Sequence, residues 1–136
     1  MLAGARLMLL NPATMESTTF VLPAGPAWKG LGSPAGSRGY LYRDPTGTNG
    51  PCTTVRVMPG TVAKAVCTGK RGSIPFDLDE AMQNALTVSL QLGAGVPQCA
   101  TYGGTIGADA GTASPGPKGI FRATKSAATL GDCPAP

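Results

Sequence analysis

Short apolar runs, many of them alternating with polar residues, recur along the whole chain between turns rich in Gly and Pro. Alternation with a period of two is typical of β-strands, because successive side chains point to opposite faces of a sheet. Turn residues separate nearly all of these runs. The pattern predicts strands at residues 5–10, 17–22, 38–43, 52–58, 61–67, 73–78, 85–92, 97–103 and 119–124.

The spacing of these runs, roughly ten residues, favours an all-β fold. We expect a two-sheet antiparallel β-sandwich, jelly-roll-like or Ig-like, that forms a single domain over residues 1–136. One weak helical signal covers residues 78–86, where Asp79 would act as the cap. Because a β-rich run follows directly, we expect at most one short helical turn there.

Four cysteines in a chain without histidine point to disulfides rather than to a metal site. The sequence has no Cys-x-x-Cys pair, and no histidine is present to complete a zinc site. We therefore expect no metal and no cofactor. Two structural disulfides are typical of exported proteins, so the expected location is secreted, periplasmic or on the cell surface.

The register of one hairpin predicts which cysteines pair. If the turn at Pro59 closes a hairpin whose paired residue numbers sum to 119, Val55 lies opposite Lys64 and Cys52 lies directly opposite Cys67. Opposed residues come close enough for a disulfide, whereas a β-bulge would break this argument.

Cys99 and Cys133 remain as the second pair. This disulfide would tie the tail, residues 127–136, to the strand at 97–103. A closed loop of 15 residues stabilises a fold by about 3 kcal/mol in the chain-entropy model, so two such links matter for a core of this size.

Charge and hydropathy argue against nucleic acid and membrane insertion. Charged residues make up 13% of the chain, and the formal net charge is +4. The eleven Lys and Arg are spread from Arg6 to Lys125, with no cluster longer than Lys70-Arg71, whereas nucleic-acid-binding proteins concentrate them on one stripe. No apolar run approaches the roughly 18 residues of a membrane span.

Candidate catalytic groups are few. The lack of histidine excludes the usual Ser-His and Cys-His nucleophiles. The only cluster of acids is at residues 77–80, where Asp77 and Asp79 would share one side of a continued strand and could act as a paired acid and base. The alternative is a capped turn with solvated acids. We predict no catalytic residues and keep an Asp-dependent hydrolase as the second alternative.

The loop from Asp44 to Gly50 has oxygen ligands at alternate positions, loosely like a calcium loop. It lacks the second acid and the terminal Glu of such loops, so a polar turn between two strands is the preferred interpretation. Calcium near Asp44 remains an open alternative.

Three aromatic residues form the remaining candidate site. Tyr40 and Tyr42 alternate onto one face of a strand, and Trp28 lies just upstream. Such a group is either a platform that stacks sugars or one corner of the hydrophobic core. A glycan or small ligand bound by Trp28, Tyr40 and Tyr42 is therefore the first alternative to a structural role.

The apolar run from Ala5 to Leu10 is interpreted as a strand rather than a signal peptide, because Arg6 interrupts it and no small-residue cleavage site follows. If the protein is exported, its true amino terminus lies upstream. The strand would then leave an incomplete edge, which recruits either upstream domains of the same protein or a second copy.

A string of features covers most of the chain: residues 17–23, Trp28-Lys29, residues 32–40, Tyr42-Arg-Asp44, Gly50-Pro-Cys52, the Val-rich hairpin that follows to Cys67, residues 74–78, Cys99, Tyr102-Gly-Gly104 and Cys133-Pro134. In this combination the chain resembles uncharacterised secreted proteins of environmental bacteria, in which such a unit forms the carboxy-terminal part of longer and often repeated modules. The resemblance implies an exported β-domain with further chain upstream, and it implies no activity. We expect a non-catalytic structural or adhesion module of an exported bacterial protein.

Overall fold

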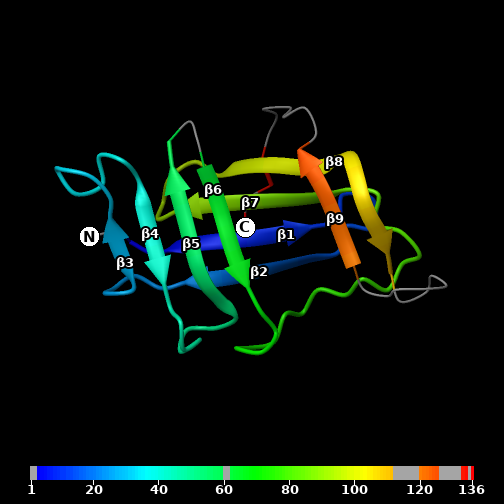
Figure 1. Cartoon of the computed structure of the whole chain (residues 1–136), viewed down its shortest axis with the longest axis horizontal. Helices are drawn as coiled ribbons and strands as arrows, with labels where there is room; N and C mark the ends of the chain where they lie inside the picture. The colour runs from blue at the N-terminus through cyan, green and yellow to red at the C-terminus, as the bar shows by residue number, and fades with distance from the viewer. Residues whose placement is uncertain (1–2, 60–61, 112–119, 126–132, 135) are drawn as a thin grey trace. The chain divides into compact units, whose positions relative to one another are not determined.

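A computed structural model describes residues 3–59, 62–111, 120–125, 133–134 and 136 (Figure 1). All regular structure in this part of the chain is β, in two antiparallel sheets, which confirms the predicted fold class. One sheet has five strands in the order β2-β1-β7-β8-β9, and the other has four in the order β3-β4-β5-β6. The strands are β1 (Ala5–Leu10), β2 (Ser17–Leu22), β3 (Trp28–Gly30), β4 (Tyr40–Arg43), β5 (Cys52–Met58), β6 (Val62–Cys67), β7 (Leu86–Leu92), β8 (Gln98–Ala110) and β9 (Ile120–Lys125).

Three of the predicted strands match the structure in both bounds: β1, β2 and β5. The short β3 was not predicted, and β8 runs seven residues past the predicted end at residue 103. The added part of β8 is rich in Gly and Ala, which have little β-propensity. Its sequence therefore lacks the alternation of apolar and polar residues that predicts a strand.

The strand predicted at residues 73–78 is absent, and residues 78–86 form no helical turn. Pro75 cannot donate to a sheet ladder. The backbone N–H of Asp77 donates to Oε1 of Glu16 at 2.8 Å instead of to a neighbouring strand. Side-chain hydrogen bonds thus replace the ladder in this segment.

The amino-terminal strand does not lie at an edge, so that expectation was wrong. β1 lies between β2 and β7 within the five-stranded sheet. Leu7, Met8 and Leu10 are all buried along it. A strand that is buried on both faces has a nearly continuous apolar sequence. The apolar sequence of β1 therefore reflects its central place in the sheet and not an unprotected edge.

The chain divides into two compact units. The first comprises Met1–Arg6, Phe20–Ile74 and Leu92–Gly95, and the second comprises Leu7–Thr19, Pro75–Gln91 and Val96–Pro136. The first unit contains the whole four-stranded sheet, and the second contains β8 and β9. The expectation of one domain over residues 1–136 stays a prediction.

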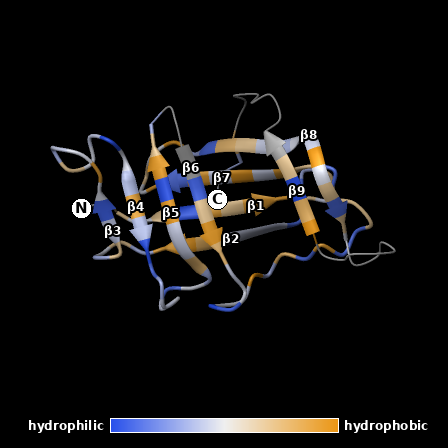
Figure 2. Ribbon diagram, in the orientation of Figure 1, coloured by the Kyte–Doolittle hydropathy of each residue, from blue (hydrophilic) through white to orange (hydrophobic). Residues whose placement is uncertain are grey.

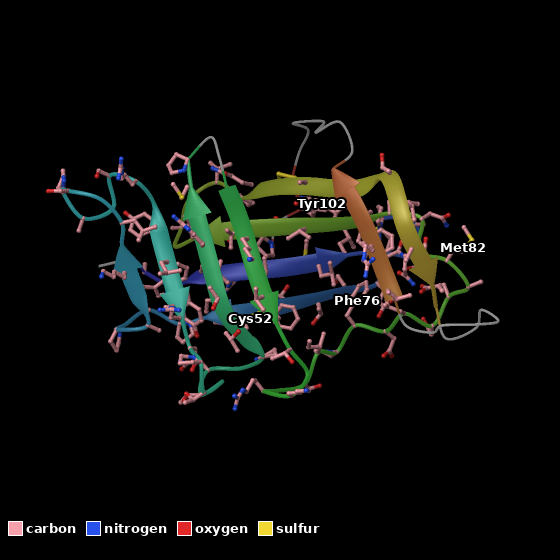
Figure 3. All side chains as sticks on the ribbon, viewed as in Figure 1. Cys52, Phe76, Met82 and Tyr102 are labelled. Carbon is pink, nitrogen blue, oxygen red and sulfur yellow. A yellow bond between two sulfur atoms is a disulfide. The ribbon has the colours of Figure 1, made fainter. Side chains whose placement is uncertain are left out.

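The hairpin of β5 and β6 contains the predicted disulfide between Cys52 and Cys67, but not the predicted register. Figure 3 labels Cys52 on β5. In the body of the hairpin, Val55 pairs with Ala65 rather than with Lys64. A register shift between Cys52 and Thr54 inserts one residue and brings Cys52 back opposite Cys67. The pairing of the cysteines was correct because a bulge offsets the one-residue error in the strands.

The second disulfide, between Cys99 and Cys133, is also confirmed, with 5.5 Å between the two Cα atoms. Cys99 lies on β8 opposite Ser89 of β7. The Ser89 hydroxyl, which is fully buried, donates to the backbone oxygen of Pro134 at 2.8 Å. One covalent link and one buried hydrogen bond therefore hold residues 133–134 against the sheet, while most of the predicted tail at 127–136 lies outside the described residues.

Removal of either disulfide is expected to destabilise the protein strongly. The closed loops span 15 and 34 residues. The chain-entropy model then predicts losses of about 3 kcal/mol for Cys52→Ala with Cys67→Ala and about 3.8 kcal/mol for Cys99→Ala with Cys133→Ala. Urea unfolding of the two double variants measures both losses. A chelator should leave the oxidised protein unchanged, and unfolding by the chelator alone would contradict a purely covalent role for the cysteines.

The hydrogen bond from Ser89 should depend on the second disulfide. In the oxidised protein we expect Ser89→Ala to lower the free energy of unfolding by about 1 kcal/mol. In the Cys99→Ala, Cys133→Ala background the same substitution should have a smaller effect, because residues 133–134 are no longer held nearby. A double-mutant cycle by urea unfolding measures the coupling. Equal effects in both backgrounds would show that the tail docks without its disulfide.

Candidate functional site

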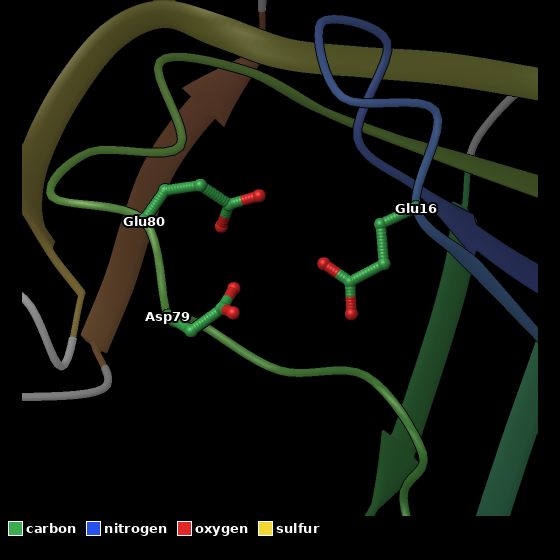
Figure 4. A group of neighbouring side chains, drawn as sticks. All are labelled: Glu16, Asp79 and Glu80. Carbon is green, nitrogen blue, oxygen red and sulfur yellow. The ribbon is translucent and has the colours of Figure 1, made fainter.

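Three carboxylates gather in the second unit (Figure 4). One carboxylate oxygen from each of Glu16, Asp79 and Glu80 lies within 4.8 Å of the other two. Glu16 comes from the turn between β1 and β2, and the other two come from the irregular segment before β7. Glu16 and Glu80 are half-buried, and Asp79 is exposed.

A buried amide organises the turn that carries Glu16. The backbone N–H of Asn11 donates to the carbonyl of Glu16 at 2.9 Å, and Oδ1 of Asn11 accepts the N–H of Ala13 at 2.9 Å. Met15 takes up the left-handed conformation, with φ of 64°. The short polar side chain of Asn11 thus closes the turn, which is the usual role of Asn in such loops.

Gln83 joins this turn to the acidic segment. Its side-chain oxygen accepts Nδ2 of Asn11 at 2.8 Å, and its side-chain nitrogen donates to the Glu80 carboxylate. Asn11 and Gln83 are each 1% exposed. Because both amides are buried and bonded, the network fixes Glu80 beside the Glu16 turn.

β8 supports the same segment from its carboxyl end. The Asp109 carboxylate accepts the backbone N–H groups of Gln83 at 2.7 Å and Asn84 at 2.6 Å. The N–H of Gly111 donates to the carbonyl of Ala81 at 3.1 Å. A Cβ at Gly111 would overlap the backbone of Glu80, so only glycine fits there.

The environment of Glu80 favours contact with a cation over proton transfer. The hydrogen bond from the Gln83 amide is the main cause that lowers the pKa of Glu80. A general acid for use near neutral pH needs a raised pKa instead. Three carboxylates at this separation could hold a hard divalent cation such as Ca²⁺ through oxygen ligands, although most calcium sites take six to eight.

The predicted pair of Asp77 and Asp79 does not form this group. Asp79 lies with Glu16 and Glu80, whereas Asp77 contributes only its backbone N–H, to Glu16. The pairing was argued from a continued strand, and that strand is absent. Glu16 was not among the candidates, because its approach to Asp79 depends on two irregular segments far apart in the sequence.

The Asp44 loop is a turn built around one carboxylate, as the preferred interpretation held. Oδ1 accepts the hydroxyl of Thr46 at 3.2 Å and the N–H of Thr48 at 3.1 Å, and Oδ2 accepts the N–H of Asn49 at 2.7 Å. The hydrogen bond from the Asn49 backbone is the main cause that lowers the pKa of Asp44. These oxygens are used in folding the loop.

Two of the three candidate aromatic residues belong to the core. Trp28 and Tyr42 are buried and pack with their ring centroids 5.2 Å apart at an interplanar angle of 56°. The indole N–H of Trp28 donates to the carbonyl of Pro23 at 3.1 Å, and burial raises the pKa of Tyr42. Only Tyr40 is half-exposed, with its ring over Gly36. The burial of Trp28 and Tyr42 favours the interpretation of these rings as one corner of the core, and ligand binding by the three rings stays a prediction.

Comparisons with protein families, curated proteins and solved structures find no match to this chain. The described part of the chain contains no helix of the length and hydropathy needed to cross a membrane.

The lowered pKa of Asp44 predicts a pH-dependent contribution to stability. A carboxyl whose pKa is lowered by folding stabilises the protein above its unfolded pKa, and this contribution is lost as pH falls through the folded value. Asp44→Asn should therefore lower the free energy of unfolding near neutral pH. The difference from the wild type should begin to shrink below about pH 4, where the carboxyl of the unfolded chain takes up a proton, and should disappear once the native carboxylate is protonated as well. Urea unfolding over this pH range tests this, and a difference that does not change with pH would contradict it.

Proposed function

We propose that this chain is a non-catalytic module of an exported protein, with a structural or adhesive role. The observation that carries the proposal is that both disulfides form and that no cysteine in the described residues is free. Disulfides persist in oxidising compartments outside the cytosol. They suggest an extracellular or periplasmic environment, to which export is the simplest route.

The chemistry of the candidate groups supports a role without catalysis. The sequence has no histidine. The Asp44 carboxylate accepts hydrogen bonds from its own loop, and Asp109 accepts two from the segment before β7. Each of these acids holds the backbone of a loop in place, which is a structural use of a carboxylate.

The two alternatives have less support. Binding of a glycan by stacked aromatic rings needs exposed rings, and Trp28 and Tyr42 are buried. An aspartate-dependent hydrolase needs one acid with a raised pKa, whereas folding lowers that of Glu80. Of the predicted pair Asp77 and Asp79, only Asp79 belongs to the acidic group that such a hydrolase would use.

The proposal predicts a difference between oxidised and reduced protein. The chain should form both disulfides when it is produced behind a secretion signal, as shown by peptide mapping without reductant. The same chain produced in a reducing cytosol should be digested much faster by a protease, because the reduced form populates unfolded states more often. A reduced form that resists the protease as well as the oxidised form does would remove the main support for export.

A further inference from the structure

The register of the four-stranded sheet aligns cations that are far apart in the sequence. Lys29 pairs with Leu41, Leu41 pairs with Arg56, and Arg56 pairs with Lys64. Residues directly opposite each other on neighbouring strands point to the same face of a sheet. One row across all four strands therefore carries Lys29, Arg56 and Lys64 on a single face.

A second row on the same face adds another cation. Arg43 pairs with Thr54, and Thr54 pairs with Val66. Arg43 is two residues from Leu41 along β4, so both share a face. We call the seven residues of these two rows the basic face: Lys29, Leu41, Arg43, Thr54, Arg56, Lys64 and Val66.

The basic face is the solvent side of its sheet. All four of its cations are exposed, whereas Trp28, Tyr42 and Val55 on the opposite face are buried. Figure 2 shows hydrophilic bands on β5 and β6. With neighbouring strands about 4.8 Å apart, the row from Lys29 to Lys64 extends about 14 Å.

Charge is distributed very unevenly between the two units. The first unit contains eight Lys and Arg against one acid, a formal charge of +7, and the second contains three against six acids, a formal charge of −3. The one acid of the first unit is Asp44, which is buried and hydrogen-bonded within its own loop. The basic face thus has no acid of its own unit to neutralise it.

One pair on the face is unfavourable for the isolated sheet. Arg56 and Lys64 are directly opposite each other on β5 and β6. Like charges in such a pair destabilise a sheet, and an opposite charge at either position would stabilise it. A multivalent anion bound across the strands would turn this repulsion into attraction.

We propose that the basic face binds an acidic polysaccharide through the carboxylate or sulfate groups of successive sugars. Neither row contains an aromatic ring on which a nucleic-acid base could stack, and the largest apolar residues are Leu41 and Val66, too few for insertion into a bilayer. The choice of a polysaccharide among polyanions rests on the proposed export of the protein. An extended row of cations that spans four strands suits electrostatic attraction to a linear polymer.

Binding to polygalacturonate, dextran sulfate and uncharged dextran tests the inference by titration calorimetry at low salt. Polygalacturonate presents carboxylates and dextran sulfate presents sulfates, so the two probes separate the two sources of charge. We expect binding to at least one of them and none to dextran. Affinity should fall steeply as salt is added, since exposed charges are screened. Binding to dextran, or binding insensitive to salt, would overturn the inference.

Matched variants locate the site. Arg56→Gln should weaken binding about two- to five-fold, and the double variant with Lys64→Gln should weaken it about four- to twenty-five-fold. Arg122 is the control: it is also exposed and within a strand, but it lies on β9 in the second unit. Arg122→Gln removes the same charge and should leave affinity nearly unchanged. Equal losses for Arg56→Gln and Arg122→Gln would show attraction to net charge alone and overturn the assignment to this face.

Stability separates a binding role from a structural one. The double variant removes a like-charged pair, so its melting temperature should equal or exceed that of the wild type. A large drop in melting temperature together with lost binding would overturn the proposal. Tighter binding to DNA than to either glycan, or self-association abolished by the same variants, would replace the polysaccharide by another partner. Failure of glycan binding leaves the disulfide tests of export unaffected, so the two proposals fail separately.

Discussion

The register between β5 and β6 is the constraint on which the rest of the four-stranded sheet depends. Side chains alternate with a period of two, so a shift by one residue would move every side chain of β6 to the other face. With the register that places Val55 opposite Lys64, the lysine would point to the face where Val55 is 1% exposed. The observed register pairs Lys64 with Arg56 instead and keeps its ammonium group in solvent. The bulge before Thr54 then reconciles this register with a disulfide at the open end of the hairpin.

This conflict explains how far the sequence could predict the fold. Alternation located β1, β2 and β5 in full. The hairpin register gave the pair Cys52–Cys67, and elimination gave the pair Cys99–Cys133. Alternation could not reveal the bulge, because one inserted residue leaves the cysteines opposed while it shifts every other pair. The prediction assumed that the strand from Cys52 to Val55 is regular. The need to keep the charge of Lys64 in solvent was the signal that could have revealed the bulge.

The acidic group shows a different limit. Its geometry depends on Asn11 and Gln83, two buried amides that join a turn to an irregular segment. Neither segment has a hydrophobic period, so no pattern predicts that Glu16 approaches Asp79. The sequence predicted a strand at residues 73–78 and a weak helical signal at residues 78–86. Pro75 and the hydrogen bonds to the carboxylates of Glu16 and Asp109 instead decide the course of these residues. A sequence pattern reports burial well and polar networks poorly.

The position of the cations of the first unit depends on the strand register and could not be predicted from their spacing in the sequence. They are scattered along the sequence, and that dispersal argued against nucleic-acid binding. The register nevertheless brings four of them to one face. A hairpin with Arg56 opposite Lys64 has an electrostatic disadvantage, and the adjacent disulfide offsets it by closing the open end covalently. Since the covalent link supplies stability that does not depend on side-chain charge, the exposed residues of β5 and β6 need not form favourable pairs with each other. A disulfide at the end of the hairpin therefore allows the face of the sheet to carry like charges, which a sheet held only by cross-strand pairs would disfavour.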